Sequence, residues 1–187
     1  SGNLDIFKFL LENNRFNIDK SLRKILIKIS IKFDSIEFFN FLASEKDFSE
    51  ENFLYSIGCN SISIVELFIN KIDFSNLYVS YNHCNLPLLF YLIESNQEDV
   101  LNVLINSKFV TGNEEFQNHS LFYSAVKNHL FDLALKLYSR GQFDVNDEYL
   151  LNDFCSDKLI FDFLIKFPDI NLNSIQPLKM NIIDKCD

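Results

Sequence analysis

The stretch VLNVLI, residues 100–105, decides the fold, because five similar hexapeptides occur elsewhere in the chain. Each has a polar residue at its third position and apolar residues around it. The other copies are IFKFLL (6–11), FFNFLA (38–43), IVELFI (64–69), ALKLYS (134–139) and IFDFLI (160–165). Apolar residues at this density indicate a helix that is buried around most of its circumference. The starts at 6, 38, 64, 100, 134 and 160 are 26 to 36 residues apart, which is typical of a repeat architecture.

A second helical pattern lies between successive hexapeptides, and it is predicted to form the first helix of each pair. It covers residues 22–31, 53–57, 88–93, 121–126 and 149–154. Polar segments at 16–19, 47–49, 72–75, 143–146 and 169–171 are predicted to be turns. The hexapeptide helices are expected to begin at the polar residues Asn3, Ser35, Ser61 and Ser95, the last in a capping box with Glu98.

The composition favours an all-α fold. Four glycines and three prolines in 187 residues are too few for the turns of an all-β protein. A hydrophobic fraction of 48% is sufficient for a buried core. We therefore predict an α-solenoid of stacked helix-turn-helix repeats.

Charge and targeting signals limit the classes of partner. A net charge of −9 disfavours nucleic acid and anionic membranes as partners. No apolar run reaches the roughly 20 residues that span a bilayer, and no signal peptide opens the sequence. We expect a cytoplasmic, monomeric protein whose four cysteines are free thiols, although the sequence does not determine the oligomeric state.

Catalytic and cofactor signatures are not found in the sequence. It has no nucleophile elbow, glycine-rich phosphate loop, zinc motif or calcium loop. A histidine such as His83, His119 or His129 could pair with Cys84 or Cys155 as base and nucleophile, but surface or turn histidines are more common. No enzyme activity, metal or cofactor is predicted.

Two charged features have structural interpretations. The carboxylate pairs 50–51, 114–115 and 147–148 each precede a predicted first helix, where negative charge complements the helix dipole. The basic amphipathic segment 20–32 could pass for a membrane or nucleic-acid element. As a first helix, however, it is expected to use Leu22, Ile25, Leu26 and Ile29 for packing and to expose its lysines.

Several short words resemble those of ankyrin repeats. The T-P-L-H-x-A word that opens the first ankyrin helix is similar to Leu86-Pro87-Leu88-Leu89, to residues 119–125 and to residues 176–179. Later parts of the ankyrin unit resemble residues 2–6, Gly141 and residues 144–146. The Thr and His of the opening word are missing in every repeat. Tetratricopeptide repeats are the main alternative, but their period of about 34 residues tolerates less variation than these intervals show.

The resemblance to divergent ankyrin repeats implies one domain over residues 1–187, and we expect it to be a segment of a longer array. The approximate units are 1–19, 20–49, 50–75, 76–110, 111–146, 147–173 and a partial 174–187. Its implied function is that of a protein-binding scaffold that binds partners through its concave surface and turn tips. A structural spacer within a larger protein is the alternative.

The two longest connections, 76–84 and 111–117, are predicted to contact the partner. Tyr78, Tyr81 and Phe116 are expected to be apolar anchors, with His83 beside them. A basic or mixed-charge protein segment would then meet rim charges at Glu114, Glu115, Asp147 and Glu148. Alternatively, Tyr78 and Phe116 fold back and seal adjacent repeats.

Overall fold

The fold is that of a computed structural model, which describes residues 2–13, 18–110, 114–139, 150 and 157–170. The chain divides into two compact units. Unit 1 consists of Ser1–Leu77 and Gln97–Phe109, and unit 2 of Tyr78–Asn96 and Val110–Asp187. Each unit is described by itself.

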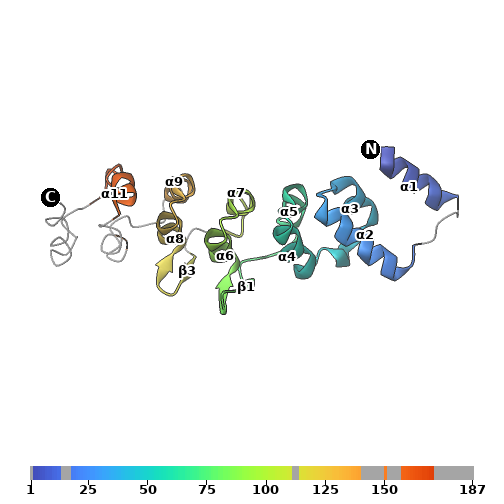
Figure 1. The fold of residues 1–187 in the computed structure, drawn as a ribbon, viewed down its shortest axis with the longest axis horizontal. Coiled ribbons are helices and arrows are strands. Elements are labelled where there is room, and N and C mark those ends of the chain that lie inside the picture. Colours follow the sequence, from blue (N-terminus) through green and yellow to red (C-terminus); the bar gives the residue numbers. More distant parts are fainter. Residues whose placement is uncertain (1, 14–17, 111–113, 140–149, 151–156, 171–187) are drawn as a thin grey trace. The chain divides into compact units, whose positions relative to one another are not determined.

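Unit 1 is helical (Figure 1). Its elements are α1 (Gly2–Glu12), α2 (Lys20–Lys32), α3 (Ile36–Leu42), the 3-10 helix η1 (Glu45–Asp47), α4 (Glu50–Gly58), α5 (Ile62–Phe68) and α7 (Glu98–Ile105). Successive helices α2 and α3 pack together, as do α4 and α5. In addition, α2 packs on α4, and α5 packs on both α3 and α7. Helix pairs therefore lie against one another within this unit.

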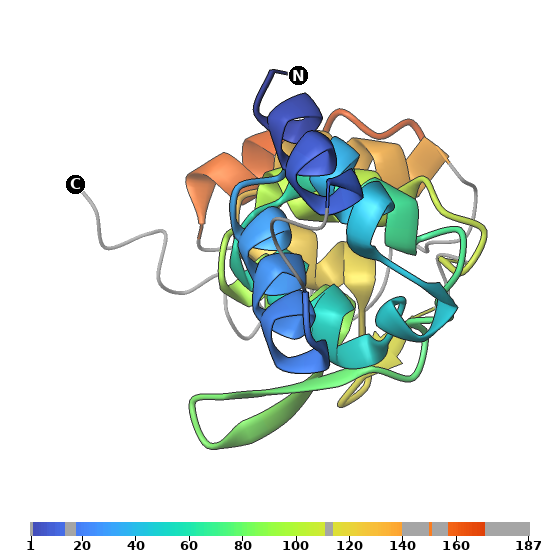
Figure 2. The same ribbon diagram turned by 90° about the vertical axis from the view of Figure 1, so that its right-hand side faces the viewer.

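Unit 2 combines helices with two short antiparallel hairpins. Its elements are β1 (Tyr78–Tyr81), β2 (Cys84–Pro87), α6 (Leu88–Glu94), β3 (Glu115–Phe116), β4 (His119–Ser120), α8 (Leu121–Lys127), α9 (Phe131–Ser139) and α11 (Lys158–Leu164). Helix α8 packs on α6 and on α9. The β1–β2 hairpin is the long green loop in Figure 2.

The six hexapeptides are helical, as predicted, and form α1, α3, α5, α7, α9 and α11. The predicted first helices α2, α4, α6 and α8 are also present. The chain is therefore mostly helical. The predicted helix at 149–154 falls almost entirely outside the described residues.

One turn recurs after α2, α4, α6 and α8, which we call the first helices. In each case the second residue after the helix has a positive φ: Asp34 (49°), Asn60 (54°), Asn96 (55°) and His129 (58°). After α2, the backbone N–H of Asp34 donates to Ile31 O and that of Ser35 to Ser30 O, both at 2.9 Å. This hydrogen-bond pair defines a Schellman turn.

The same pair of hydrogen bonds follows α4, joining Asn60 to Ile57 and Ser61 to Ser56, and follows α8, joining His129 to Val126 and Leu130 to Ala125. After α6, the backbone N–H of Asn96 donates to Ile93 O. Asn, Asp and His enter the left-handed region more readily than most residues, which explains how the chain forms four such turns with so few glycines. A turn with a left-handed residue therefore recurs after four helices of the chain.

The predicted helix caps need correction. Ser35 and Ser61 occupy N-cap positions, but within the described residues neither hydroxyl accepts a hydrogen bond from its own helix. Ser95 instead ends α6, and Gln97 precedes α7, so the predicted box with Glu98 is wrong. Asn3 lies inside α1.

At α5 the cap comes from the neighbouring helix pair. The carboxylate of Asp34 accepts hydrogen bonds from the backbone N–H of Ser63 (3.0 Å) and of Ile64 (2.9 Å). The Ser61 hydroxyl, just before α5, donates to Ile31 O near the end of α2. These bonds fix the α2–α3 turn against the start of α5.

Phenylalanine rings form the centre of unit 1. Phe39, Phe53, Phe68 and Phe74 are at most 1% exposed. The Phe68 ring lies 5.7 Å from the rings of Phe39 and Phe53 and 5.3 Å from that of Phe48, measured between centroids. Such offset or tilted ring pairs contribute energy beyond their buried area.

The two hairpins are the main departure from the predicted all-α fold. Each turns through two residues with positive φ, Asn82-His83 in the first and Gln117-Asn118 in the second. Two left-handed residues in a two-residue loop are the signature of a type I′ turn. The sequence prediction missed these turns because it relied on Gly, Pro and Asn-Gly signals. The predicted loops 76–84 and 111–117 therefore contain strands.

The carboxylate pairs are also placed differently from one another. Glu50 and Glu51 lie within the first turn of α4 and not before it, but they are at the helix N-terminus, as predicted. Glu115 instead lies in β3, and the Glu114 carbonyl accepts a hydrogen bond from the backbone N–H of Leu121 at 3.1 Å. The pair at 147–148 lies outside the described residues.

A polar cluster connects α2 to η1. The Asp47 carboxylate accepts hydrogen bonds from Arg23 Nη2 (2.6 Å), from the Ser44 hydroxyl (2.7 Å) and from the Ser44 backbone N–H (2.8 Å). Burial on its own raises the pKa of Asp47, but the bonds from Ser44 and Arg23 outweigh it and lower that pKa below its ordinary value.

We expect the lowered pKa of Asp47 to make unit 1 acid-sensitive. A carboxyl whose pKa is lower in the folded state contributes stability above its unfolded pKa, near 3.9, and that stability is lost as pH falls through the folded value. Asp47→Asn should cost about 1–2 kcal/mol at pH 7 and flatten the decline in stability below about pH 4. Urea denaturation across this pH range measures both effects. An unchanged pH profile in Asp47→Asn would contradict the assignment.

Candidate functional site

A groove opens between the two hairpins of unit 2, and we call it the hairpin groove. Its volume is about 280 Å³. The hairpins contribute Tyr81 and Phe116, and the first helices α6 and α8 contribute Phe90 and Tyr123. This groove therefore joins the two segments that were predicted to contact a partner.

Ring contacts hold the walls of the hairpin groove in place. Tyr81 packs edge-on against Tyr91, with ring centroids 5.5 Å apart. The Phe116 ring lies 5.8 Å from that of Phe90. His119 stacks on Tyr123 at 4.0 Å, with only 9° between the ring planes. Because these rings already pack on one another, the groove presents a preformed aromatic surface.

Both charge signs border the hairpin groove. Glu94 ends α6 and Lys127 ends α8, and both side chains are exposed. Glu94 Oε1 accepts a hydrogen bond from Asn128 Nδ2 at 3.3 Å. The groove thus offers an apolar floor with one acidic and one basic residue at its edge.

The predicted contact residues divide into three groups. Tyr81 and Phe116 line the hairpin groove. Tyr78 is 56% exposed in β1, and His83 is exposed at the β1–β2 turn, but neither lines the groove. Glu114 and Glu115 also lie outside it, and Asp147 and Glu148 fall outside the described residues. Of the two residues expected to seal repeats, Phe116 packs on Phe90 of the preceding first helix, whereas Tyr78 is exposed.

Sequence reasoning missed the groove residues that come from the helices. Phe90 and Tyr123 are 4% and 7% exposed, so their helical spacing was read as core packing alone. They are largely buried, yet one edge of each still forms the groove wall. Because this spacing is also that of core residues, no signal in the sequence separated them from the core.

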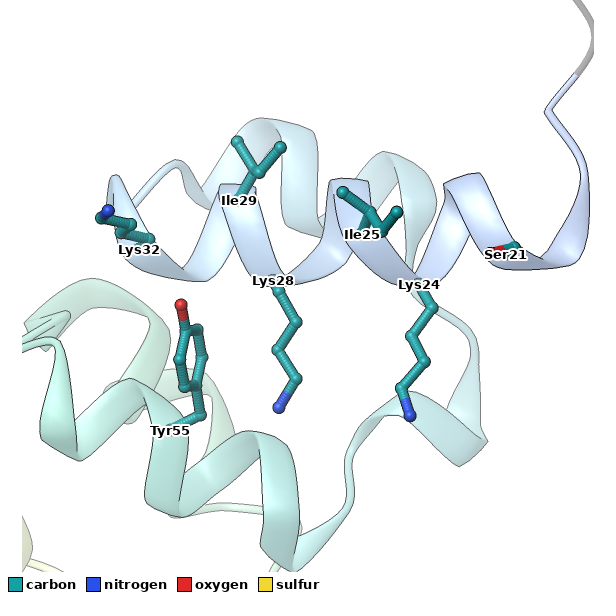
Figure 3. Close-up of a pocket in the computed structure, with 7 residues that line it drawn as sticks. All are labelled: Ser21, Lys24, Ile25, Lys28, Ile29, Lys32 and Tyr55. Carbon is teal, nitrogen blue, oxygen red and sulfur yellow. The ribbon is translucent and has the colours of Figure 1, made fainter.

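Unit 1 has a second groove, of about 340 Å³, which we call the lysine groove. Helix α2 lines it with Lys24, Ile25, Lys28, Ile29 and Lys32, and α4 contributes Tyr55 (Figure 3). The expectation that Ile25 and Ile29 serve packing is wrong, because they are 53% and 45% exposed. Helix α2 is rotated so that Ile27, Ser30 and Ile31 are buried instead.

The two grooves occupy equivalent positions relative to the recurring turn. Lys24, Lys28 and Lys32 precede the left-handed residue Asp34 by ten, six and two residues. In unit 2, the groove residues that precede Asn96 by the same numbers of positions are Leu86, Phe90 and Glu94.

The second helix of each groove also contributes a residue at an equivalent position. Tyr55 of α4 lies five positions before Asn60, and the hairpin-groove residue Ser124 of α8 lies five positions before His129. Within each unit, the groove therefore lies between two consecutive first helices.

Lys28 is held over the wall of the lysine groove. Its Nζ lies 4.4 Å from the centroid of the Tyr55 ring and 3.0 Å from Glu51 Oε1. The hydrogen bond from Lys28, together with the positive charges of Lys28 and Lys24, lowers the pKa of Glu51. A hydrogen bond with Cys59 and burial raise the pKa of Tyr55, so its hydroxyl stays protonated at neutral pH.

Within the described residues, no group of three or more His, Cys, Asp or Glu side chains could hold a metal ion. Over the same residues, no helix combines the length and apolar character needed to cross a membrane. Comparison of the chain with models of protein families, with curated proteins and with solved structures finds no match.

Proposed function

We propose that this chain is a non-enzymatic, protein-binding scaffold built from ankyrin-like helix pairs. The observation that carries the proposal is the equivalent position of the hairpin groove and the lysine groove relative to the recurring turn. A groove that recurs at one place in a repeat arises from the packing of the helices, so its lining can vary to suit a partner.

The ankyrin-like assignment has further support in the order of elements. In unit 2, a hairpin precedes each of the first helices α6 and α8. In unit 1, two complete helix pairs, α2–α3 and α4–α5, pack side by side. An ankyrin unit likewise has a turn followed by two antiparallel helices. We extend this local packing to an α-solenoid whose first helices and hairpins form the binding surface.

The hairpin groove suits a protein segment of mixed charge with an apolar side chain. Tyr81 and Phe116 form apolar walls, and aromatic residues of this kind often dominate binding energy. Glu94 and Lys127 at the edge can pair with charges of either sign. Contacts of this kind determine orientation and association rate more than affinity.

We expect the double variant Tyr81→Ala/Glu94→Lys to lose the partners of the hairpin groove. Removing an aromatic anchor and reversing a rim charge should weaken binding about 10-fold to 100-fold. Quantitative affinity capture from cells, comparing this variant with the natural sequence, measures the loss protein by protein. Tyr78→Ala is the matched control, because Tyr78 lies in the same hairpin but does not line the groove.

Comparing the proteins captured by the three chains shows whether the hairpin groove is the binding site. Proteins captured by the natural sequence and by Tyr78→Ala, but not by the double variant, support the proposal. If all three chains capture the same proteins in equal amounts, the hairpin groove is not the binding site, and the function as a structural spacer is favoured.

A further inference from the structure

We propose that the lysine groove of unit 1 binds an acidic amphipathic helix of a partner protein. The inference rests on the proposed scaffold function but concerns a different groove and specifies the chemistry of its occupant. It is carried by the exposed face of α2, where a basic stripe and an apolar stripe run side by side.

The basic stripe has helical spacing. Lys24, Lys28 and Lys32 are four residues apart, so they lie one above another along α2, about 6 Å apart. Carboxylates on a partner helix with the same four-residue spacing would face them one for one. Arg23 is not part of this stripe, since it is bound to Asp47 at 2.6 Å.

The apolar stripe follows one residue later. Ile25, Ile29 and Phe33 also recur every four residues, and they are 53%, 45% and 73% exposed. Figure 3 shows Ile25 and Ile29 on one flank of α2 and Lys24 and Lys28 on the other, reaching towards α4. A helix lying along the edge between the two flanks would contact both stripes, and burial of the apolar stripe would favour binding.

The charge of the groove selects an acidic occupant. Three lysines line it, and the carboxylate of Glu51 lies 3.0 Å from Lys28 Nζ. The hydrogen bond from Lys28 and the charges of Lys28 and Lys24 lower the pKa of Glu51, so this groove favours the charged form of a carboxylate. A partner carboxylate would gain from the same charges.

A protein helix fits this groove better than an anionic membrane does. The lysines lie in a depression between α2 and α4, with Tyr55 as the opposite wall, whereas a bilayer presents a flat surface. The chain as a whole carries a net charge of −9, which an anionic membrane would repel. A narrow segment can enter the depression without bringing a large negative surface close to the rest of the chain.

The test is a selection of a displayed random-peptide library against the complete chain, followed by affinity measurement. Enriched peptides should place Asp or Glu and an apolar residue at three- to four-residue spacing. Fluorescence anisotropy of a labelled enriched peptide then gives its Kd. Lys24→Glu/Lys32→Glu should raise that Kd about tenfold or more, and added salt should weaken binding to the natural sequence.

Three variants separate the groove from general charge effects. Ile25→Ser/Ile29→Ser should also weaken binding. Both isoleucines are about half exposed, so this variant should remain folded, which circular dichroism checks. Lys24→Gln/Lys32→Gln removes the charges without reversing them and should give an intermediate Kd. Lys46→Glu is the matched control, because Lys46 is an exposed lysine of unit 1 outside the groove, and its Kd should be unchanged.

Several results would overturn the inference. One is that the selection enriches no acidic peptide. Another is that an enriched peptide binds the lysine and isoleucine variants as tightly as it binds the natural sequence. Sedimentation with phosphatidylserine vesicles, compared with phosphatidylcholine vesicles, tests the membrane alternative, and lysine-dependent binding to the former without peptide binding would favour it. If the hairpin groove still captures its partner proteins when the lysine groove fails these peptide tests, this inference is overturned but the proposed scaffold function is not.

Discussion

Phe68→Ala is expected to lower the free energy of unfolding of unit 1 by about 3–5 kcal/mol, the range found for deleting a buried phenylalanine ring. Phe68 is fully buried, and its ring contacts the rings of Phe39, Phe48 and Phe53. These three partners come from α3, the segment after η1, and α4. A cavity at this point would therefore weaken the packing of two helix pairs at once.

Phe33→Ala is the matched control for this experiment. Phe33 is the same residue type in the same unit, but its side chain is 73% exposed. Its removal should change stability by less than about 0.5 kcal/mol. Urea denaturation followed by circular dichroism measures both variants. Equal destabilisation by the two substitutions would show that the ring cluster around Phe68 is not the core of the unit.

Asp34→Ala should lower the free energy of unfolding by about 2–3 kcal/mol, because Asp34 stabilises the fold through both its side chain and its backbone conformation. Its carboxylate caps the start of α5 through the N–H groups of Ser63 and Ile64, and loss of a cap typically costs about 1 kcal/mol. Its backbone also has a φ of 49°. Alanine in this left-handed conformation costs roughly another 1–2 kcal/mol.

Two further substitutions separate these contributions. Asp34→Gly removes the cap but suits the left-handed backbone, whereas Asp34→Asn suits the backbone and keeps one oxygen acceptor. The expected order of stability is the natural sequence first, then asparagine, glycine and alanine. Thermal and urea unfolding of the four chains give this order. A glycine variant no more stable than the alanine variant would exclude the backbone contribution.

The helices of this chain could be predicted from the sequence because their apolar spacing is dense and regular. The hexapeptide at 100–105, for example, lies wholly within α7, and the pattern at 121–126 lies within α8. Periodicity carries this information locally, so no knowledge of neighbouring helices was needed.

The apolar pattern of a single helix could not predict features that depend on how neighbouring helices pack. Which flank of α2 is buried depends on where α3 and α4 pack, and this placed Ile25 and Ile29 at the surface instead of in the core. The cap of α5 comes from Asp34, about thirty residues earlier in the chain. Neither relation is visible in a window of one helix.

The candidate site was predicted in part for the same reason. Tyr81 and Phe116 stood out because they are aromatic residues in long connections. Phe90 and Tyr123 have the same spacing as core residues, so sequence alone could not show that one edge of each forms a groove wall. The type I′ turns were missed because asparagine, histidine and glutamine adopt the conformations for which glycine is the usual signal.

The recurring Schellman turn also has a consequence for how the chain acquires its structure. Each turn connects a first helix to the segment directly after it, so many native contacts join residues that are close in sequence. Helical domains rich in local contacts fold in roughly microseconds to milliseconds, because little loop entropy is lost before their contacts form. A helix pair such as α4–α5 can therefore nucleate folding locally, and it can do so during synthesis, before the later pairs have left the ribosome.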